Sequence, residues 1–371
     1  MKYPILLSIL ILLSCQTETT TKITDNEPLQ WLTLKAKNNA NGKHIVLISG
    51  DEEYRSEEAL PQLAKILSTH HGFDCTVLFA QDPDSLGVIN PNYSFNIPGM
   101  EHLEQADLAI LFTRFRALPN EQMQHFENYL LNGKPLITIR TATHAFNFKD
   151  TTHAFKHYGW NYKGDKTDWH LGFGKKILGE TWYTHHGRHK HQSTRGIIAE
   201  ESKNHPILNG IPDGSIWGPT DVYGIRMPMD GDAQPIILGQ TIDRTGEFDE
   251  SDILYGMRES DTEIATVTQQ GKNAEPYNPN EPMPPIVWTK SYQLEQGKKG
   301  QSLTSTIGAS TDMLDEEVRR LFVNGVYYLL DLDIPSKATV DIVGTYEPSA
   351  FAFHSDEYWE EKGLRIHSLK D

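Results

Sequence analysis

Residues 140–146, RTATHAF, hold side chains that could move protons, and they directly follow the apolar run 136–139. In an open α/β sheet, ligands gather at the carboxyl ends of the strands. His144 has an imidazole, which titrates near neutral pH. Arg140 could hold an anionic or enolate oxygen. We therefore expect His144 to be a general acid/base and Arg140 its oxyanion partner, although His144 could equally brace the turn.

Two further polar stretches, GDEEYR (50–55) and FTRFR (112–116), also follow apolar runs. We expect Glu53 to supply a second catalytic carboxylate and Arg114 a second cation for an oxyanion. A base, a carboxylate and cations at strand ends suit proton abstraction next to a carbonyl. The candidate substrate-binding residues from these stretches are Tyr54, Arg55 and Arg116. The alternative is that Glu53, Arg55 and Arg140 form a structural ion-pair network.

Thr143 is the hydroxyl in the 140–146 turn that we consider as a nucleophile, in place of cysteine or serine. A threonine nucleophile needs an adjacent base. A threonine at a turn more often bonds to the backbone. A hydrolase using Thr143 therefore stays an alternative.

A histidine-rich stretch, THHGRHKH (184–191), suggests metal chemistry. A catalytic zinc site uses about three protein ligands and leaves one position open. We take His170, His185 and His186 as candidate ligands for a divalent metal, zinc or manganese. Because neighbours in a strand point to opposite faces, only one of His185 and His186 can face a given site. We assign His189 and His191 to an exposed cationic loop.

Three more side chains are candidates for binding sugar. Asp221 and Tyr223, in TDVYG (220–224), could bind hydroxyl groups. Trp169 could stack on a sugar ring, although tryptophan is more common in a core.

The pattern of apolar runs predicts an α/β fold with a doubly wound, mostly parallel sheet. Short apolar runs predict strands, and amphipathic stretches predict helices between them. We expect strands at 43–49, 75–80, 106–112 and 136–139, helices at 56–71 and 119–132, further strands at 193–200 and 233–240, and a terminal helix at 315–332. One domain would span residues 43–371, with a surface excursion at about 240–285.

The first residues have the pattern of an export signal and an anchor. Residues 1–14 predict a signal peptide, because their apolar run is too short to span a bilayer. LLSC (12–15) resembles a bacterial lipobox, which implies that Cys15 is lipidated and that 15–42 form a tether. Gln16 favours the outer over the inner membrane. Cys75 is then the one cysteine left, so no internal disulfide can form.

The amino-acid composition limits the classes of partner that the protein could bind. The chain has 371 residues, 38% of them hydrophobic, and a formal net charge of -16. Nucleic acid is excluded as a partner, because phosphate binding needs a basic face.

Six ordered stretches carry a resemblance to a known family: GDEEYRSEEALPQLAKIL, FTRFRALPNEQMQHFENYLLNGKPLITIRTATHAF, NHPILNGI, TDVYGI, PPIVWTKSY and IGASTDMLDEEVRRLFVNGVYYLLDLDIP. Together they resemble the ThuA-like (trehalose-utilisation) family, in particular longer exported members of polysaccharide-degrading bacteria. The resemblance implies a class I glutamine-amidotransferase-like, flavodoxin-like architecture and a role in carbohydrate catabolism. The turn after residue 139 lacks the amidotransferase cysteine, which argues against glutamine amidotransferase activity.

From these observations we predict a membrane-anchored envelope lipoprotein that acts on a sugar or glycan. Its expected reaction is acid/base transformation of a keto-sugar or keto-glycoside, of isomerase, lyase or hydrolase type. The cofactor is unknown, and a divalent metal stays open. The main alternative is a lipoprotein that binds glycans without turnover.

Overall fold

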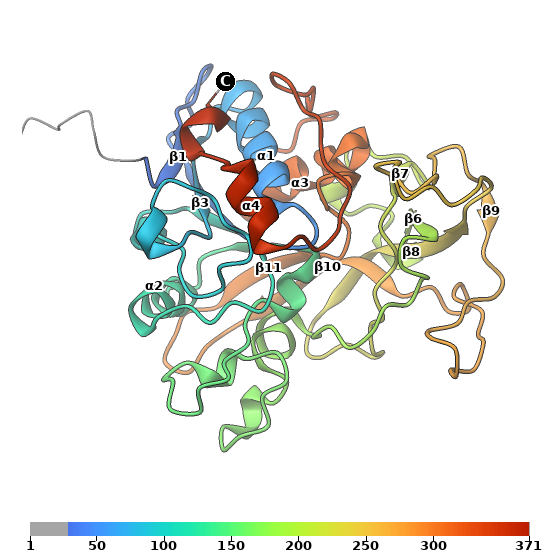
Figure 1. Ribbon diagram of the computed structural model, residues 1–371, viewed down its shortest axis with the longest axis horizontal. Helices are drawn as coiled ribbons and strands as arrows, with labels where there is room; N and C mark the ends of the chain where they lie inside the picture. Colours follow the sequence, from blue (N-terminus) through green and yellow to red (C-terminus); the bar gives the residue numbers. More distant parts are fainter. Residues whose placement is uncertain (1–28, 371) are drawn as a thin grey trace, which may run out of the picture.

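The computed structural model describes residues 29–370 and shows one mixed sheet with helices on both faces (Figure 1). The strand order is β1-β3-β2-β4-β5-β11-β10-β8-β6-β7, and β9 pairs with β8. The strands are β1 Trp31–Leu34, β2 His44–Gly50, β3 Asp74–Phe79, β4 Leu108–Thr113, β5 Leu136–Ile139, β6 Gln192–Ile198, β7 Ile216–Gly218, β8 Gln234–Asp243, β9 Glu263–Ile264, β10 Pro285–Tyr292 and β11 Gly300–Ser305.

Five strands, β3, β2, β4, β5 and β11, form a parallel core and confirm the predicted α/β fold. Ile45 and Leu47 of β2 belong to one buried cluster, and Val46 and Ile48 belong to another. Alternate side chains of one strand therefore reach opposite faces, so both faces of the core are covered. Helices α1 (Ser56–His70) and α3 (Glu316–Leu329) lie on one face, and α2 (Asn120–Leu131) lies on the other (Figure 1).

The other half of the sheet is antiparallel. Strand β11 pairs in parallel with β5 and antiparallel with β10, and β8, β6 and β7 continue antiparallel beyond β10. The sequence predicts strands near β6 and β8, but not that they extend the parallel core into a second half. The segment between β8 and β10 is mostly irregular and contains the short strand β9.

The amino-terminal boundary of the domain differs from the prediction. Residues 31–34 fall in the predicted tether, yet they form β1 and pair antiparallel with β3. Leu32 is fully buried in the core, which explains why this part belongs to the domain. The predicted signal peptide (1–14) and Cys15 lie outside the described residues. Within residues 29–370, no helix has the length and apolar character needed to cross a membrane.

Two details of the helices differ from what the sequence predicts, which is Ser56 as the N-cap of the helix at 56–71 and a terminal helix at 315–332. Arg55, with φ of 60°, is the residue that precedes α1, and Ser56 provides no cap because its Oγ accepts from the backbone N–H of Asp51 at 3.0 Å. The helix α3 is followed by a further short helix, α4 (Asp356–Lys362), so it is not terminal. Trp359 of α4 is buried.

Candidate functional site

The loops after β2, β4 and β5 meet at one edge of the parallel core, as the sequence predicts. Thr141, in the turn after β5, donates a short hydrogen bond to the carboxylate of Asp51. The backbone N–H of Phe115 donates to the carbonyl of His144 at 3.1 Å. Residues from the three predicted stretches therefore lie in direct contact.

Arg140 is buried in the centre of this edge rather than directed towards a substrate. Its guanidinium carbon lies 4.4 Å from the ring centroid of Tyr54 and 4.0 Å from that of Tyr223. It donates to the backbone carbonyl of Asp221 at 2.7 Å and to its Oδ1 at 3.1 Å. Its φ of 48° is uncommon for a residue with a side chain and persists only where surrounding contacts hold it. Arg140 thus positions Asp221 and does not reach an oxyanion as predicted.

Asp221 organises two histidines from the loop before β6. Its Oδ2 lies 2.7 Å from Nδ1 of His185, and its Oδ1 lies 3.0 Å from Nδ1 of His189. Burial opposes ionisation of Asp221, but the charge of His185, the hydrogen bonds of both histidines and Arg140 outweigh it and lower the pKa of Asp221. Burial also opposes protonation of His185, but the Asp221 carboxylate outweighs it and raises the pKa of His185.

Glu53 completes the cluster from the loop after β2. Its Oε1 lies 3.6 Å from Nε2 of His189, and its Oε2 lies 3.5 Å from Nε of Arg114. Burial and the charge of Asp51 raise the pKa of Glu53 to about 7, against the opposing effect of Arg114 and other cations. A carboxyl group that titrates near neutral pH is suited to general acid/base catalysis. The side chain keeps 10% of its surface exposed, so solvent reaches it.

The same cluster fits a divalent metal ion. His185, His189 and Asp221 each offer one ligand atom, and these atoms lie within 4.8 Å of one another. Two imidazoles and a carboxylate are ligands that zinc and manganese accept. Both Nδ1 atoms are hydrogen-bonded to Asp221 in this structure, so a cation held by all three groups would take the place of these hydrogen bonds.

Two predicted metal ligands lie elsewhere. His170 is exposed, and its Nε2 lies 2.9 Å from the carbonyl of Gly164. His186 points away from Asp221, with its Nε2 2.7 Å from the carbonyl of Pro279. His189, which we assigned to an exposed loop, belongs to the cluster instead. His189 lies four residues after His185, and this spacing could have indicated that the two share a site. In a loop, however, such spacing does not fix the direction in which a side chain points.

Three predicted substrate-binding residues are structural. Arg116 is fully buried, donates to the carbonyl of Pro91 at 2.8 Å and pairs with Glu52 at 2.6 Å. Arg55 is fully buried beneath α4, with its guanidinium over the ring of Trp359 at 4.7 Å. Trp169 packs in the core cluster on the α2 side of the sheet. For Arg55, whose Nε lies 3.6 Å from Oε1 of Glu57, the alternative of a structural ion-pair network describes the structure better than substrate binding. Arg116, which that alternative did not include, is structural as well.

His144 and Thr143 lie beside the cluster but are enclosed. The imidazole of His144 is 3% exposed and packs between Phe115 and Trp182, with centroid distances of 4.9 and 5.1 Å. Burial, with the nearby charges of Arg114, His185 and Arg140, lowers the pKa of His144 well below its usual value. Oγ1 of Thr143 lies 3.3 Å from Nδ1 of His144. This placement favours a neutral imidazole that braces the turn, which was the alternative for His144.

Comparison with known proteins finds distant similarities to solved structures. No model of a protein family matches the chain, and no curated protein matches it. A structure described as ThuA-like from Bacteroides uniformis shares 16% identity over 78% of this chain and 92% of that chain, with a TM-score of 0.41. Another, from Parabacteroides merdae, shares 14% over 85% and 98%, with a TM-score of 0.42. A cytoplasmic protein from Salmonella typhimurium shares 13% over 77% and 98%, with a TM-score of 0.34. Likenesses this distant carry no argument about activity.

Proposed function

We propose that this protein transforms a keto-sugar or keto-glycoside by proton transfer, with Glu53 as the acid/base. The observation that carries the proposal is the carboxyl of Glu53, whose pKa is raised to about 7, set 3.6 Å from His189. At neutral pH such a group can accept a proton from carbon and return it. Carbohydrate as the substrate class rests on the sequence resemblance to the ThuA-like family.

The neighbours of Glu53 supply positive charge for an oxygen that becomes anionic as the proton leaves. Arg114 has 19% of its side chain exposed and His185 has 29%. Both therefore keep surface free for a ligand, unlike the enclosed Arg140. A divalent cation held by His185, His189 and Asp221 would polarise a carbonyl oxygen at the same place.

Hydrogen exchange tests this proposal directly. The full-length protein is incubated in D₂O with a panel of keto-glucosides, and deuterium at the carbon beside the carbonyl is followed by NMR. We expect exchange or turnover with wild type and its loss in Glu53→Gln. Tight binding of plain glycans with no exchange on any keto-sugar would instead favour the non-catalytic glycan-binding lipoprotein.

The location is a second part of the proposal. We propose that Cys15 carries lipid and anchors the protein in the cell envelope, on the basis of the LLSC sequence. Metabolic labelling with a palmitate analogue should mark wild type and leave Cys15→Ala unmarked. Label in both proteins would contradict lipidation at this residue.

A further inference from the structure

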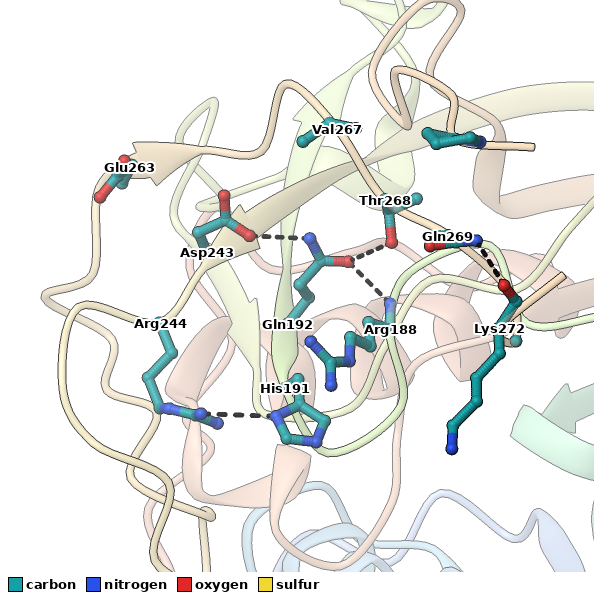
Figure 2. A pocket seen from close by; sticks show the side chains of 12 residues that line it. Arg188, His191, Gln192, Asp243, Arg244, Glu263, Val267, Thr268, Gln269 and Lys272 are labelled. Atoms are coloured by element: carbon teal, nitrogen blue, oxygen red, sulfur yellow. Dashed lines mark hydrogen bonds between the residues drawn. The ribbon is translucent and has the colours of Figure 1, made fainter. Parts of the chain in front are cut away.

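A cavity of about 720 Å³ lies beside the loop that carries His185 and His189 (Figure 2). Residues 188–192 form one wall, and residues 263–276 form much of the other. Its volume falls in the range of small-molecule binding sites. The cluster around Glu53 does not use any of its lining residues.

Gln192 fixes the floor of this cavity. Its side chain is buried, and its Nε2 donates to Oδ1 of Asp243 at 2.7 Å. Its Oε1 accepts from the backbone N–H of Arg188 at 2.7 Å and from the hydroxyl of Thr268 at 3.1 Å. The side-chain amide of Gln192, in β6, thus connects the end of β8, the loop 184–191 and the segment between β8 and β10. The cavity is therefore built by specific hydrogen bonds.

Two cations face the cavity without partners. Among residues 29–370, neither the guanidinium of Arg188 nor the ammonium of Lys272 has a hydrogen-bond or ion-pair partner. Figure 2 shows the Arg188 side chain beside His191 and the Lys272 side chain extending along the other wall. The guanidinium of Arg244 also lines the cavity, with its Nη2 3.4 Å from Nδ1 of His191, so positive charge gathers here. In a chain of net charge -16, such a concentration is unusual.

We propose that this cavity binds an acidic saccharide, whose carboxylate or sulfate ester pairs with Arg188 and Lys272. Guanidinium and ammonium groups are the usual partners of such anions. The carboxylates of Asp243 and Glu263 can accept hydrogen bonds from sugar hydroxyls, and Figure 2 shows Glu263 on the side opposite Lys272. The saccharide nature of the ligand rests on the proposed function, whereas its negative charge is inferred from Arg188 and Lys272, the two lining cations that have no partner in the described part of the chain.

Side chains of the segment that lines the cavity donate hydrogen bonds to the backbone of the loop that carries His185 and His189. Nε2 of Gln270 donates to the carbonyls of His186 and Gly187, each at 3.0 Å. The hydroxyl of Tyr277 also donates to the carbonyl of His186. The segment with Lys272 therefore holds the loop with His185 and His189. An acidic sugar unit in the cavity would thus occupy a subsite next to the one where Glu53 acts.

Calorimetric titration of the full-length protein tests the proposal. The probes are a galacturonate trisaccharide, a sulfated trisaccharide and a neutral trisaccharide of the same length. We expect one acidic probe to bind at least about tenfold more tightly than the neutral one, and its affinity to fall as salt is raised. Whichever of the two acidic probes binds more tightly shows whether the cavity prefers a carboxylate or a sulfate ester.

Three variants make the test specific. Arg188→Gln and Lys272→Gln should each weaken binding of the acidic probe about tenfold and leave the neutral probe unchanged. Lys149→Gln removes an exposed cation away from the cavity and should change nothing. Equal affinity for all three probes, or equal weakening in all three variants, would overturn the proposal. Because binding is measured without turnover, this outcome is distinct from failure of the proton-transfer reaction.

Discussion

Oε1 of Glu53 lies 3.6 Å from Nε2 of His189, although the two residues come from opposite halves of the sheet. Glu53 follows β2 in the parallel core, and His189 precedes β6 in the antiparallel half. The candidate site therefore forms where the halves join, and neither half holds it alone. Asp221, which precedes β8 and contacts Arg140 of the core, links the two in the same way.

Replacing Glu53 by Gln should abolish proton transfer while leaving the fold intact. The amide keeps the shape of the side chain but cannot accept a proton, so we expect hydrogen exchange on a keto-sugar to fall by about 10²–10⁴-fold. In wild type, the rate should rise with pH up to about 7, where Glu53 loses its proton. The pH profile of kcat/KM measures this. Glu101→Gln, which removes an exposed carboxylate from the short 3-10 helix Met100–Glu104, is the control and should keep wild-type rates.

The same substitution should change how stability depends on pH. The pKa of Glu53 is raised in the folded state, so its favourable contribution is present below pH 4.5 and is lost as pH rises to about 7. This shift corresponds to on the order of 3 kcal/mol. Glu53→Gln should therefore gain free energy of unfolding relative to wild type between pH 4.5 and pH 8, measured by urea denaturation. A constant difference across this range would contradict burial of the Glu53 charge.

The parallel core could be predicted from the sequence because its strands are continuous apolar runs. β2, β4 and β5 are each buried nearly throughout, so periodicity and length identify them. The short strand β1 is not predicted, because Trp31–Leu34 falls in the predicted tether and forms a strand through its pairing with β3. The antiparallel half depends on long-range pairing between β8, β10 and β11, which no local pattern encodes.

The sequence predicts the loops of the candidate site and some of its side chains, namely Glu53, Arg114, His185 and Asp221, but it misassigns others. Placement of polar residues after β2, β4 and β5 located the edge where they meet. Which side chains face a ligand depends on tertiary contacts: Arg55 turns under Trp359, Arg116 pairs with Glu52, and His189 turns towards Asp221. Each of these partners is remote in sequence or comes from a loop, so spacing alone could not assign them.

Metal content should distinguish the three neighbouring histidines. If a divalent cation binds at the cluster, His185→Ala and His189→Ala should each lower its stoichiometry strongly, because each removes one of about three ligands. His186→Ala is the matched control, since its ring contacts the carbonyl of Pro279 instead. Elemental analysis of purified full-length proteins measures this. Loss of metal in His186→Ala, with none in His189→Ala, would show that the wrong imidazole has been assigned.

Removing the charge of Arg140 should destabilise the protein severely. Arg140→Met leaves the buried carboxylate of Asp221 and the two tyrosine rings without their cation. Breaking a buried ion pair costs about 3–5 kcal/mol. Lys175→Met breaks an ion pair with Asp230, which is 57% exposed, and should cost less than about 1 kcal/mol. Urea denaturation compares them, and similar losses in both variants would exclude a central role for Arg140.

Thr143 provides the test of the hydrolase alternative. Its Oγ1 lies 3.3 Å from Nδ1 of His144, so a nucleophile and a base are adjacent, but the side chain is only 1% exposed. A substrate carbon could not reach this hydroxyl without movement of the turn. We therefore expect Thr143→Val to keep turnover within about twofold and to lose about 1 kcal/mol of stability, because its hydrogen bonds disappear. Mass spectrometry of the protein with a keto-glycoside should find no covalent adduct on Thr143. An adduct on Thr143, together with an inactive Thr143→Val variant, would contradict acid/base catalysis by Glu53. It would favour a hydrolase in which Thr143 is the nucleophile.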